Sequence, residues 1–264
     1  SDLKYMTPSY LMRKILQKDN PFIDKKEMHK MGTIQQNIAE VEKRVADAAA
    51  RAGRKPEDVL LLAVSKTKPV ELIKEAVACG LTSLGENKVQ EIMEKYEPMG
   101  PDVHWHLIGH LQTNKVKYII DKVDMIHSVE SLRLAEEINK RAAAKNLVMD
   151  VLVEVNMADE ESKFGVKPEE VEAFLHDLSQ LPNIRVRGLM TVAPFVENPE
   201  ENRVYFRKMR ELLVDMNGKK IDNINMDTLS MGMTGDYEVA IEEGATIVRV
   251  GTGIFGERFY PNKA

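Results

Sequence analysis

Apolar residues along the chain follow two patterns, one with the spacing of a helix face and one of short continuous runs. The first helical pattern has apolar residues at Ile34, Ile38, Val41, Val45 and Ala49. Gly53 follows, and a glycine just past the last periodic residue is a common helix stop. We therefore expect a helix that ends before Gly53 and a strand that begins shortly after it.

Eight short segments are predicted to be β-strands, the shortest of them partly from the count of elements. They span residues 59–64, 82–84, 104–108, 125–127, 148–155, 185–190, 228–230 and 246–250. Helical patterns separate them, most clearly at residues 131–144, 168–178 and 202–216. Because strands alternate with helices, the pattern favours a closed α/β barrel of the (β/α)8 TIM type over an open doubly wound sheet.

The length of the chain fits one such domain. It has 264 residues, and a TIM-type barrel typically needs about 250. We expect one barrel domain over residues 32–264. Residues 1–31 are predicted to be an appended N-terminal segment with enough apolar residues to pack as a helix.

Composition and charge exclude several classes of protein. Hydrophobic residues make up 43% and charged residues 30% of the chain, as in soluble globular proteins. No apolar run approaches the roughly 20 residues that span a bilayer, and the chain does not open with a secretion signal. The net charge of -5 argues against a nucleic-acid-binding surface. The single cysteine, Cys79, excludes an intrachain disulfide and fits a reducing cytoplasm. We expect a cytoplasmic protein that acts on a small molecule.

Lys66 ends the most apolar run of the chain, residues 59–66. A lysine at the end of a buried strand can form a Schiff base with an aldehyde once burial or a neighbouring charge lowers its pKa. The alternative is a solvated lysine that begins the loop Thr67-Lys68-Pro69. Lys66 alone does not decide between them.

Two glycine-containing segments near the C-terminus favour the first interpretation. Ser230-Met231-Gly232-Met233-Thr234 and residues 247–256 each follow an apolar stretch and place glycines beside hydroxyl groups. Backbone N–H groups in such turns can bind a phosphate. TIM-type barrels often bind phosphate on the loops after strands seven and eight. The two segments therefore predict a phosphate site.

Residues at the carboxyl ends of barrel strands converge on one face, where active sites are built. The candidate set is Lys66, Glu86, Asn87, His106, Gly109, Met190, Thr191, Ser230, Gly232, Arg249, Gly251 and Thr252. Pyridoxal 5′-phosphate (PLP) needs a lysine that accepts its aldehyde, donors for its phosphate and a partner for its ring nitrogen. The set supplies all three. Histidines, cysteines and carboxylates show no metal-ligand spacing, so no metal is expected.

Six motifs, in order, resemble the pyridoxal phosphate homeostasis protein family, single-domain relatives of the alanine racemase N-terminal barrel. They are residues 64–66 (VSK), 84–91 (LGENKVQE), 105–115 (WHLIGHLQTNK), 188–191 (GLMT), 230–233 (SMGM) and 249–252 (RVGT). The resemblance runs from about residue 33 to residue 260, which leaves residues 1–31 outside it.

The resemblance implies a role for each matching residue. Lys66 would hold PLP as an aldimine, and Arg249 would face the pyridine nitrogen. The phosphate would be held by Ser230, Gly232, Gly251 and Thr252. Asn87, His106 and Met190 would line the cofactor.

Several of these residues also have purely structural interpretations. Arg249 can pair with a carboxylate at the barrel mouth, and His106 can be a hydrogen-bonded core histidine. Glu86 and Asn87 can cap the helix that begins near Lys88. Met190, Met231 and Met233 are typical core residues around a ligand, and His104 and His110 are expected on the surface or in loops.

Three functions remain open from the sequence: a PLP carrier for intracellular homeostasis and delivery, an amino-acid racemase, and a regulatory protein that binds partners through the barrel surface. An arginine at the ring nitrogen should keep that nitrogen unprotonated and weaken the electron sink. Racemases of this fold use a second acid/base group from another domain. Tyr237, Tyr260 and His106 are the candidate substitutes for that group, and the chain ends soon after the predicted barrel, at Ala264. We therefore expect a monomeric carrier without fast turnover, whose partners are PLP and apo-forms of PLP-dependent enzymes.

Overall fold

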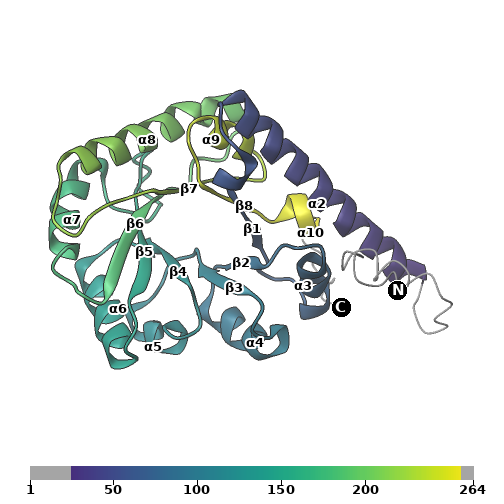
Figure 1. The fold of residues 1–264 in the computed structure, drawn as a ribbon, viewed down its shortest axis with the longest axis horizontal. Helices are drawn as coiled ribbons and strands as arrows, with labels where there is room; N and C mark the ends of the chain where they lie inside the picture. The colour runs from purple at the N-terminus through teal and green to yellow at the C-terminus, as the bar shows by residue number, and fades with distance from the viewer. Residues whose placement is uncertain (1–24, 257–264) are drawn as a thin grey trace, which may run out of the picture.

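Eight parallel strands form a closed barrel in the computed structural model of the chain, which describes residues 25–256 (Figure 1). The strands follow one another around the barrel in sequence order, and β8 pairs with β1 to close it. Their bounds are β1 (Leu60–Val64), β2 (Ser83–Glu86), β3 (His104–Leu107), β4 (Met125–Val129), β5 (Met149–Glu154), β6 (Ile184–Met190), β7 (Thr228–Met233) and β8 (Ile247–Val250). The predicted TIM-type barrel is confirmed.

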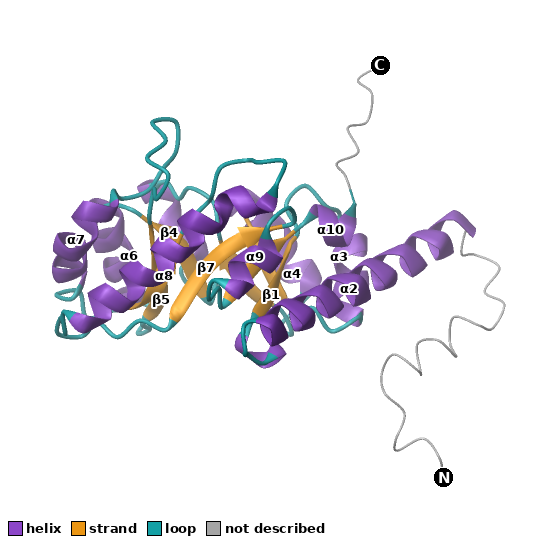
Figure 2. Ribbon diagram, turned by 90° about the horizontal axis from the view of Figure 1, so that it is seen from above, coloured by secondary structure: helices purple, strands orange, loops and turns teal. Residues whose placement is uncertain are grey.

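Helices surround the strands, as Figures 1 and 2 show from two directions. The α-helices are α2 (Lys25–Arg51), α3 (Val70–Ala78), α4 (Val89–Met99), α5 (Val116–Ile119), α6 (Leu132–Ala144), α7 (Val171–Leu178), α8 (Arg203–Gly218), α9 (Tyr237–Glu242) and α10 (Thr252–Phe255). Short 3-10 turns precede three of them, η3 (Thr113–Lys115) before α5, η4 (Pro168–Glu170) before α7 and η5 (Pro199–Asn202) before α8, and η2 (Pro56–Asp58) precedes β1. None of the described helices is both long and apolar enough to cross a membrane.

Helix α2 lies along the outside of the barrel, against α9, α10 and α3 (Figure 1). The apolar positions expected on one of its faces are buried, with Ile38 at 2% exposure and Ala49 at 0%. The helix begins at Lys25, so the expected boundary between residues 31 and 32 falls inside it. Residues 1–24 of the predicted N-terminal segment lie outside the described part of the chain.

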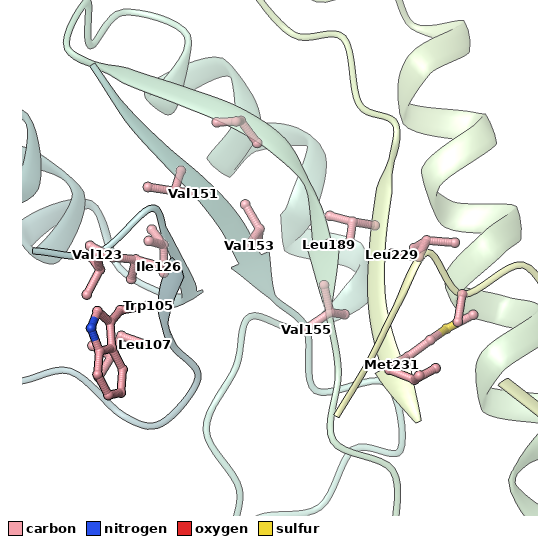
Figure 3. Packing of buried hydrophobic residues seen from close by; sticks show 14 of the residues in the cluster. Trp105, Leu107, Val123, Ile126, Val151, Val153, Val155, Leu189, Leu229 and Met231 are labelled. Atoms are coloured by element: carbon pink, nitrogen blue, oxygen red, sulfur yellow. The ribbon is translucent and has the colours of Figure 1, made fainter. Parts of the chain in front are cut away.

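The main hydrophobic core joins the strands to the surrounding helices. Figure 3 shows part of it, with Val153 of β5, Leu189 of β6 and Leu229 of β7 gathered in one cluster. Strands β6 and β7 approach so closely at Gly188 that a Cβ atom there would lie 1.7 Å from the Thr228 carbonyl oxygen. Glycine is therefore required at this contact, which fixes the register beside Met190 and Ser230.

The predicted elements match the observed ones closely, and the differences lie at their ends. Ser131 caps α6 by accepting a hydrogen bond from the Leu134 N–H, as the predicted start at residue 131 requires. Strand β7 continues to Met233, beyond the predicted end at Ser230. The extra residues include Gly232, whose φ of +98° places it in a conformation that favours glycine.

Candidate functional site

A pocket of about 320 Å³ opens where several strands end. Lys66 follows β1, Asn87 follows β2, Glu154 ends β5 and Arg249 lies in β8. The wall is completed by the loop after β5, through Asn156, Ser162, Lys163 and Phe164, and by Ile108, Gly109, His110, Val192 and Met233. An amine, an amide, a carboxyl and a guanidinium therefore meet in one cavity.

The backbone on both sides of Lys66 is held by a cluster of buried charges. Lys95 of α4 donates hydrogen bonds to the Ser65 carbonyl oxygen (2.8 Å) and to Glu86 Oε1 (2.6 Å). Glu91 Oε1 accepts from the Thr67 N–H at 2.6 Å and lies 3.0 Å from Lys95 Nζ. Thr67 has a φ of +64°, which is unusual for a residue with a branched side chain. These contacts fix the turn that carries Lys66.

Glu86 is fully buried at the centre of this cluster. Its Oε1 also accepts a hydrogen bond from the Ser65 hydroxyl at 2.7 Å. Burial raises the pKa of Glu86, whereas the hydrogen bond and charge of Lys95 oppose that rise. Glu86 therefore supports the Lys66 turn and does not cap α4, whose N-cap position is Lys88 and has no side-chain cap.

A second buried polar chain runs from Arg249 into the barrel. Arg249 Nη1 donates to Ser230 Oγ (2.7 Å), and Nη2 donates to the Thr191 carbonyl oxygen (2.9 Å). Ser230 Oγ lies 2.9 Å from His127 Nδ1, and His127 Nε2 lies 2.9 Å from His106 Nδ1. The structure thus gives Arg249 a hydroxyl and a carbonyl as its hydrogen-bond acceptors, in place of a carboxylate.

Burial determines which side chains of this hydrogen-bonded series are charged. It lowers the pKa of His106 to about 4, and it lowers that of His127 well below the usual range, with the positive charges of His106 and Arg249 adding to the effect. Burial also lowers the pKa of Arg249, to about 10. At neutral pH the two histidines are therefore uncharged, and Arg249 remains a cation.

The two glycine-containing loops lie side by side beyond β7 and β8. The Gly253 N–H donates to Thr234 Oγ1 at 3.3 Å, which joins them. At Gly232 a Cβ atom would lie 2.6 Å from the Ala240 Cβ, so a side chain there would push α9 away. Within residues 25–256, the backbone N–H groups of Gly251 and Thr252 donate no hydrogen bond. They are available to an anion, as a phosphate site requires.

The structure distributes the predicted residues over three places. Lys66, Asn87 and Arg249 line the pocket. His106, Met190 and Ser230 are buried behind it. The third group lies beyond the pocket, with Gly232 near the end of β7, Gly251 just after β8 and Thr252 at the start of α10.

Several side chains of the site were not predicted from the sequence. Glu154 lines the pocket with 9% exposure, and burial, then the charge of Glu130, raises its pKa to about 7. Lys95 and His127 support the pocket from behind through the contacts given above. His110, expected in a loop, also lines the pocket and stacks on Phe164 with ring centroids 4.1 Å apart.

The residues present fit a phosphate-bearing aldehyde such as PLP. A lysine amine and an arginine cation line the same pocket, and two unused backbone N–H groups lie in the loops beyond β8. The glycine at position 232 lets the end of β7 lie close to α9. Amine, cation and backbone donors are the groups that such a ligand uses.

Comparison with protein families and known relatives agrees with this chemistry. The model of the family "Alanine racemase, N-terminal domain" matches residues 32–259. The pyridoxal phosphate homeostasis protein of Aquifex aeolicus (strain VF5) is 51% identical over 226 residues, which cover 85% of this chain and 98% of that protein. The protein of the same name from Escherichia coli (strain K12) is 40% identical over 238 residues, covering 88% and 100% of the two chains.

Solved structures give the same result at the level of the fold. PipY of Synechococcus elongatus PCC7942, with PLP bound, is 35% identical with a TM-score of 0.71, covering 80% of this chain and all of that one. Alanine racemase from Corynebacterium glutamicum is 15% identical with a TM-score of 0.64. That match covers 85% of this chain but 60% of the racemase, and its low identity supports a shared barrel only.

Proposed function

The chain belongs to the pyridoxal phosphate homeostasis protein family, and from that premise we propose that it binds PLP in the pocket at the strand ends and serves intracellular PLP homeostasis and delivery. The observation that carries the proposal is the convergence of Lys66 and Arg249 on one pocket. Bound PLP supplies an aldehyde that reacts reversibly with an amine and a ring that withdraws electrons.

Each residue of the site has a separate task in this proposal. Lys66 links covalently to the aldehyde, and the Lys95 cluster keeps its turn in place before the ligand arrives. Arg249 would face the ring nitrogen, and its charge at neutral pH would disfavour protonation there. The phosphate is held by Ser230, Gly232, Gly251 and Thr252, whereas Asn87, His106 and Met190 line the cofactor or support its surroundings.

We favour a carrier over an enzyme with fast turnover. The homologous relatives are named for cofactor homeostasis and not for a reaction. Of the described residues that line the pocket, none is a tyrosine. Tyr237 is buried in α9, and His106 lies behind the pocket; Tyr260 lies outside the described residues. The proposed partners are therefore PLP and apo-enzymes that receive it.

One observation keeps racemisation as a second candidate. Glu154 lines the same pocket as Lys66, and its pKa near 7 suits proton transfer at neutral pH. A lysine and a carboxyl in one pocket form the minimum set for moving a proton on either side of a bound amino acid.

The two functions are separated by running two assays on one preparation. Purified protein loaded with PLP is mixed with an apo-enzyme, and recovery of the apo-enzyme's activity reports transfer. The same protein is incubated with alanine and other amino acids in D₂O, and mass spectrometry reports deuterium at Cα. If the protein is a carrier, PLP is transferred to the apo-enzyme, and deuterium does not enter Cα at the rate of about 1–10³ per second that is typical of enzymes. Exchange at such rates without transfer would replace the proposal by catalysis, and Lys66→Ala is the control for both assays.

A further inference from the structure

Glu154 is a buried carboxyl without a hydrogen-bond or ion-pair partner in the described part of the chain. It ends β5, faces the pocket and retains 9% exposure. Among residues 25–256, no side chain or backbone group pairs with its carboxyl oxygens. Burying an unpaired carboxylate is costly, so such a group either keeps its proton or awaits a ligand.

Charges of both signs surround Glu154. Glu130, which follows β4, disfavours a second negative charge, whereas Arg249 of β8 favours it. Lys66, His110 and Lys163 contribute the other titratable side chains of the pocket. Burial outweighs the effect of Arg249 and raises the pKa of Glu154 to about 7. The carboxyl therefore changes charge near neutral pH.

We propose that Glu154 sets the affinity of this pocket for its anionic aldehyde ligand through its proton: the neutral carboxyl admits the ligand, and the carboxylate opposes it. The inference rests on the proposed PLP-binding function and adds a residue that makes binding depend on pH. A neutral carboxyl can also donate a hydrogen bond to an oxygen of the ligand, which a carboxylate cannot.

Two physical effects of the carboxylate act in the same direction. It repels a phosphate-bearing ligand in a pocket where solvent screening is weak. It also favours the charged ammonium form of any amine that lies close to it, and an ammonium is not a nucleophile. Both effects weaken capture as pH rises. Glutamine has the shape of a neutral glutamic acid, so Glu154→Gln should remove both effects without removing the hydrogen-bond donor.

The test measures PLP dissociation constants for the full chain, freed of ligand, at several values between about pH 6 and pH 8.5. The wild-type protein is compared with Glu154→Gln. Titrations of PLP and of the other pocket groups are common to both proteins, so the ratio of the two constants isolates Glu154. We expect similar affinities at pH 6 and about tenfold or more tighter binding by the variant at pH 8.5. Glu161→Gln removes an exposed carboxylate from the loop after β5, and its dissociation constants should follow those of the wild type.

Calorimetry gives an independent readout of the same event. PLP binding at pH 8 in buffers of different ionisation enthalpy should show more proton uptake by the wild type than by Glu154→Gln. Parallel pH profiles with equal proton uptake would overturn the role of Glu154 while leaving PLP binding intact. Absence of PLP binding by the wild type at every pH would overturn the proposed function itself.

Discussion

The hydroxyl of Ser230 has two buried neighbours, and this fixes what it can offer a ligand. Arg249 Nη1 donates to its oxygen, and His127 Nδ1 lies 2.9 Å from it. A hydroxyl has one proton and two lone pairs. If His127 donates through Nδ1, the Ser230 proton is left for a ligand; if His127 accepts there, that proton is used inside the protein. In both cases Ser230 orients the arginine of the pocket.

Removing the Ser230 hydroxyl should therefore destabilise the protein even without ligand. Ser230→Ala leaves an Arg249 N–H and a His127 nitrogen buried without their partner, which typically costs about 1–3 kcal/mol of unfolding free energy. Urea unfolding of the ligand-free protein measures this loss of unfolding free energy. Ser162→Ala removes an exposed hydroxyl and is the control. Equal stability of Ser230→Ala and wild type would show that the hydrogen bonds of the Ser230 hydroxyl contribute nothing to the unfolding free energy.

The raised pKa of Glu154 also affects folding, and its sign can be worked out. The group titrates near 4.5 when unfolded and at about 7 when folded, so the folded protein binds the extra proton between these values. The stabilisation is complete below about pH 4.5 and is lost as pH rises through 7, a difference of about 3 kcal/mol. The unfolding free energy of the wild type should therefore fall relative to that of Glu154→Gln as pH rises over this range, so that the variant gains relative stability at high pH. A pH-independent difference would mean that the carboxyl titrates normally.

At the scale of the elements, the ends of β1 and β2 and the helix α4 form one unit around Lys66. Lys95 has a side-chain exposure of 7% and pairs with two carboxylates, Glu86 and Glu91. Lys95 and Glu91 bond to the backbone of Ser65 and Thr67, and Glu86 accepts a hydrogen bond from the Ser65 hydroxyl. The cluster therefore couples the stability of α4 to the position of the reactive lysine.

Breaking this ion pair on one side should be strongly destabilising. Lys95→Met leaves Glu86 buried without a counter-charge, for which a loss of about 3–5 kcal/mol is typical. Adding Glu86→Gln removes the unpaired charge, so the double variant should regain most of that stability. Thermal or urea unfolding tests the series, with Lys74→Met on the exposed face of α3 as the control. A Lys95→Met protein as stable as wild type would contradict the coupling.

Most elements were predictable from the sequence, because strands such as β1 and β5 are apolar runs and helices such as α2 and α6 are amphipathic; β2 (SLGE) is not an apolar run and was inferred partly from the count of strands. The convergence of Lys66, Asn87 and Arg249 was predictable as well, because the carboxyl ends of parallel strands meet at one face of a barrel. Glu154 was not, because a polar residue near the end of a strand looks the same whether it faces solvent or a pocket. Lys95 likewise has the spacing of an exposed helix residue, and only the packing of α4 against β2 buries it.

At the scale of the whole molecule, the barrel positions the segments that follow each strand, and helix α2 contacts the segment that follows β8. Asn37 of α2 donates a hydrogen bond to the Ile254 carbonyl oxygen at 3.0 Å, which ties the helix to α10 beside the proposed phosphate site. Ligand binding therefore takes place on a frame that the whole chain maintains. A ligand that binds only the folded state stabilises all of it.

Saturating PLP should consequently raise the stability of the entire barrel. At 100 times the dissociation constant the gain is about 2.7 kcal/mol, measurable as a shift in thermal unfolding. Pyridoxine 5′-phosphate, which has the phosphate but no aldehyde, should give a smaller shift. In Lys66→Ala the two ligands should stabilise equally, because the covalent link is lost. If PLP still gave a larger shift than pyridoxine 5′-phosphate in this variant, Lys66 would not be the residue that links to the aldehyde.

Reductive labelling shows which lysine carries the cofactor, and the proposed function depends on its being Lys66. Protein loaded with PLP is reduced with borohydride, digested, and analysed by peptide mass spectrometry. We expect one pyridoxyl group on the peptide that contains Lys66, together with loss of the visible absorption of the bound cofactor. Labelling of Lys68 beside it or of Lys163 across the pocket, with Lys66 unmodified, would contradict the assignment.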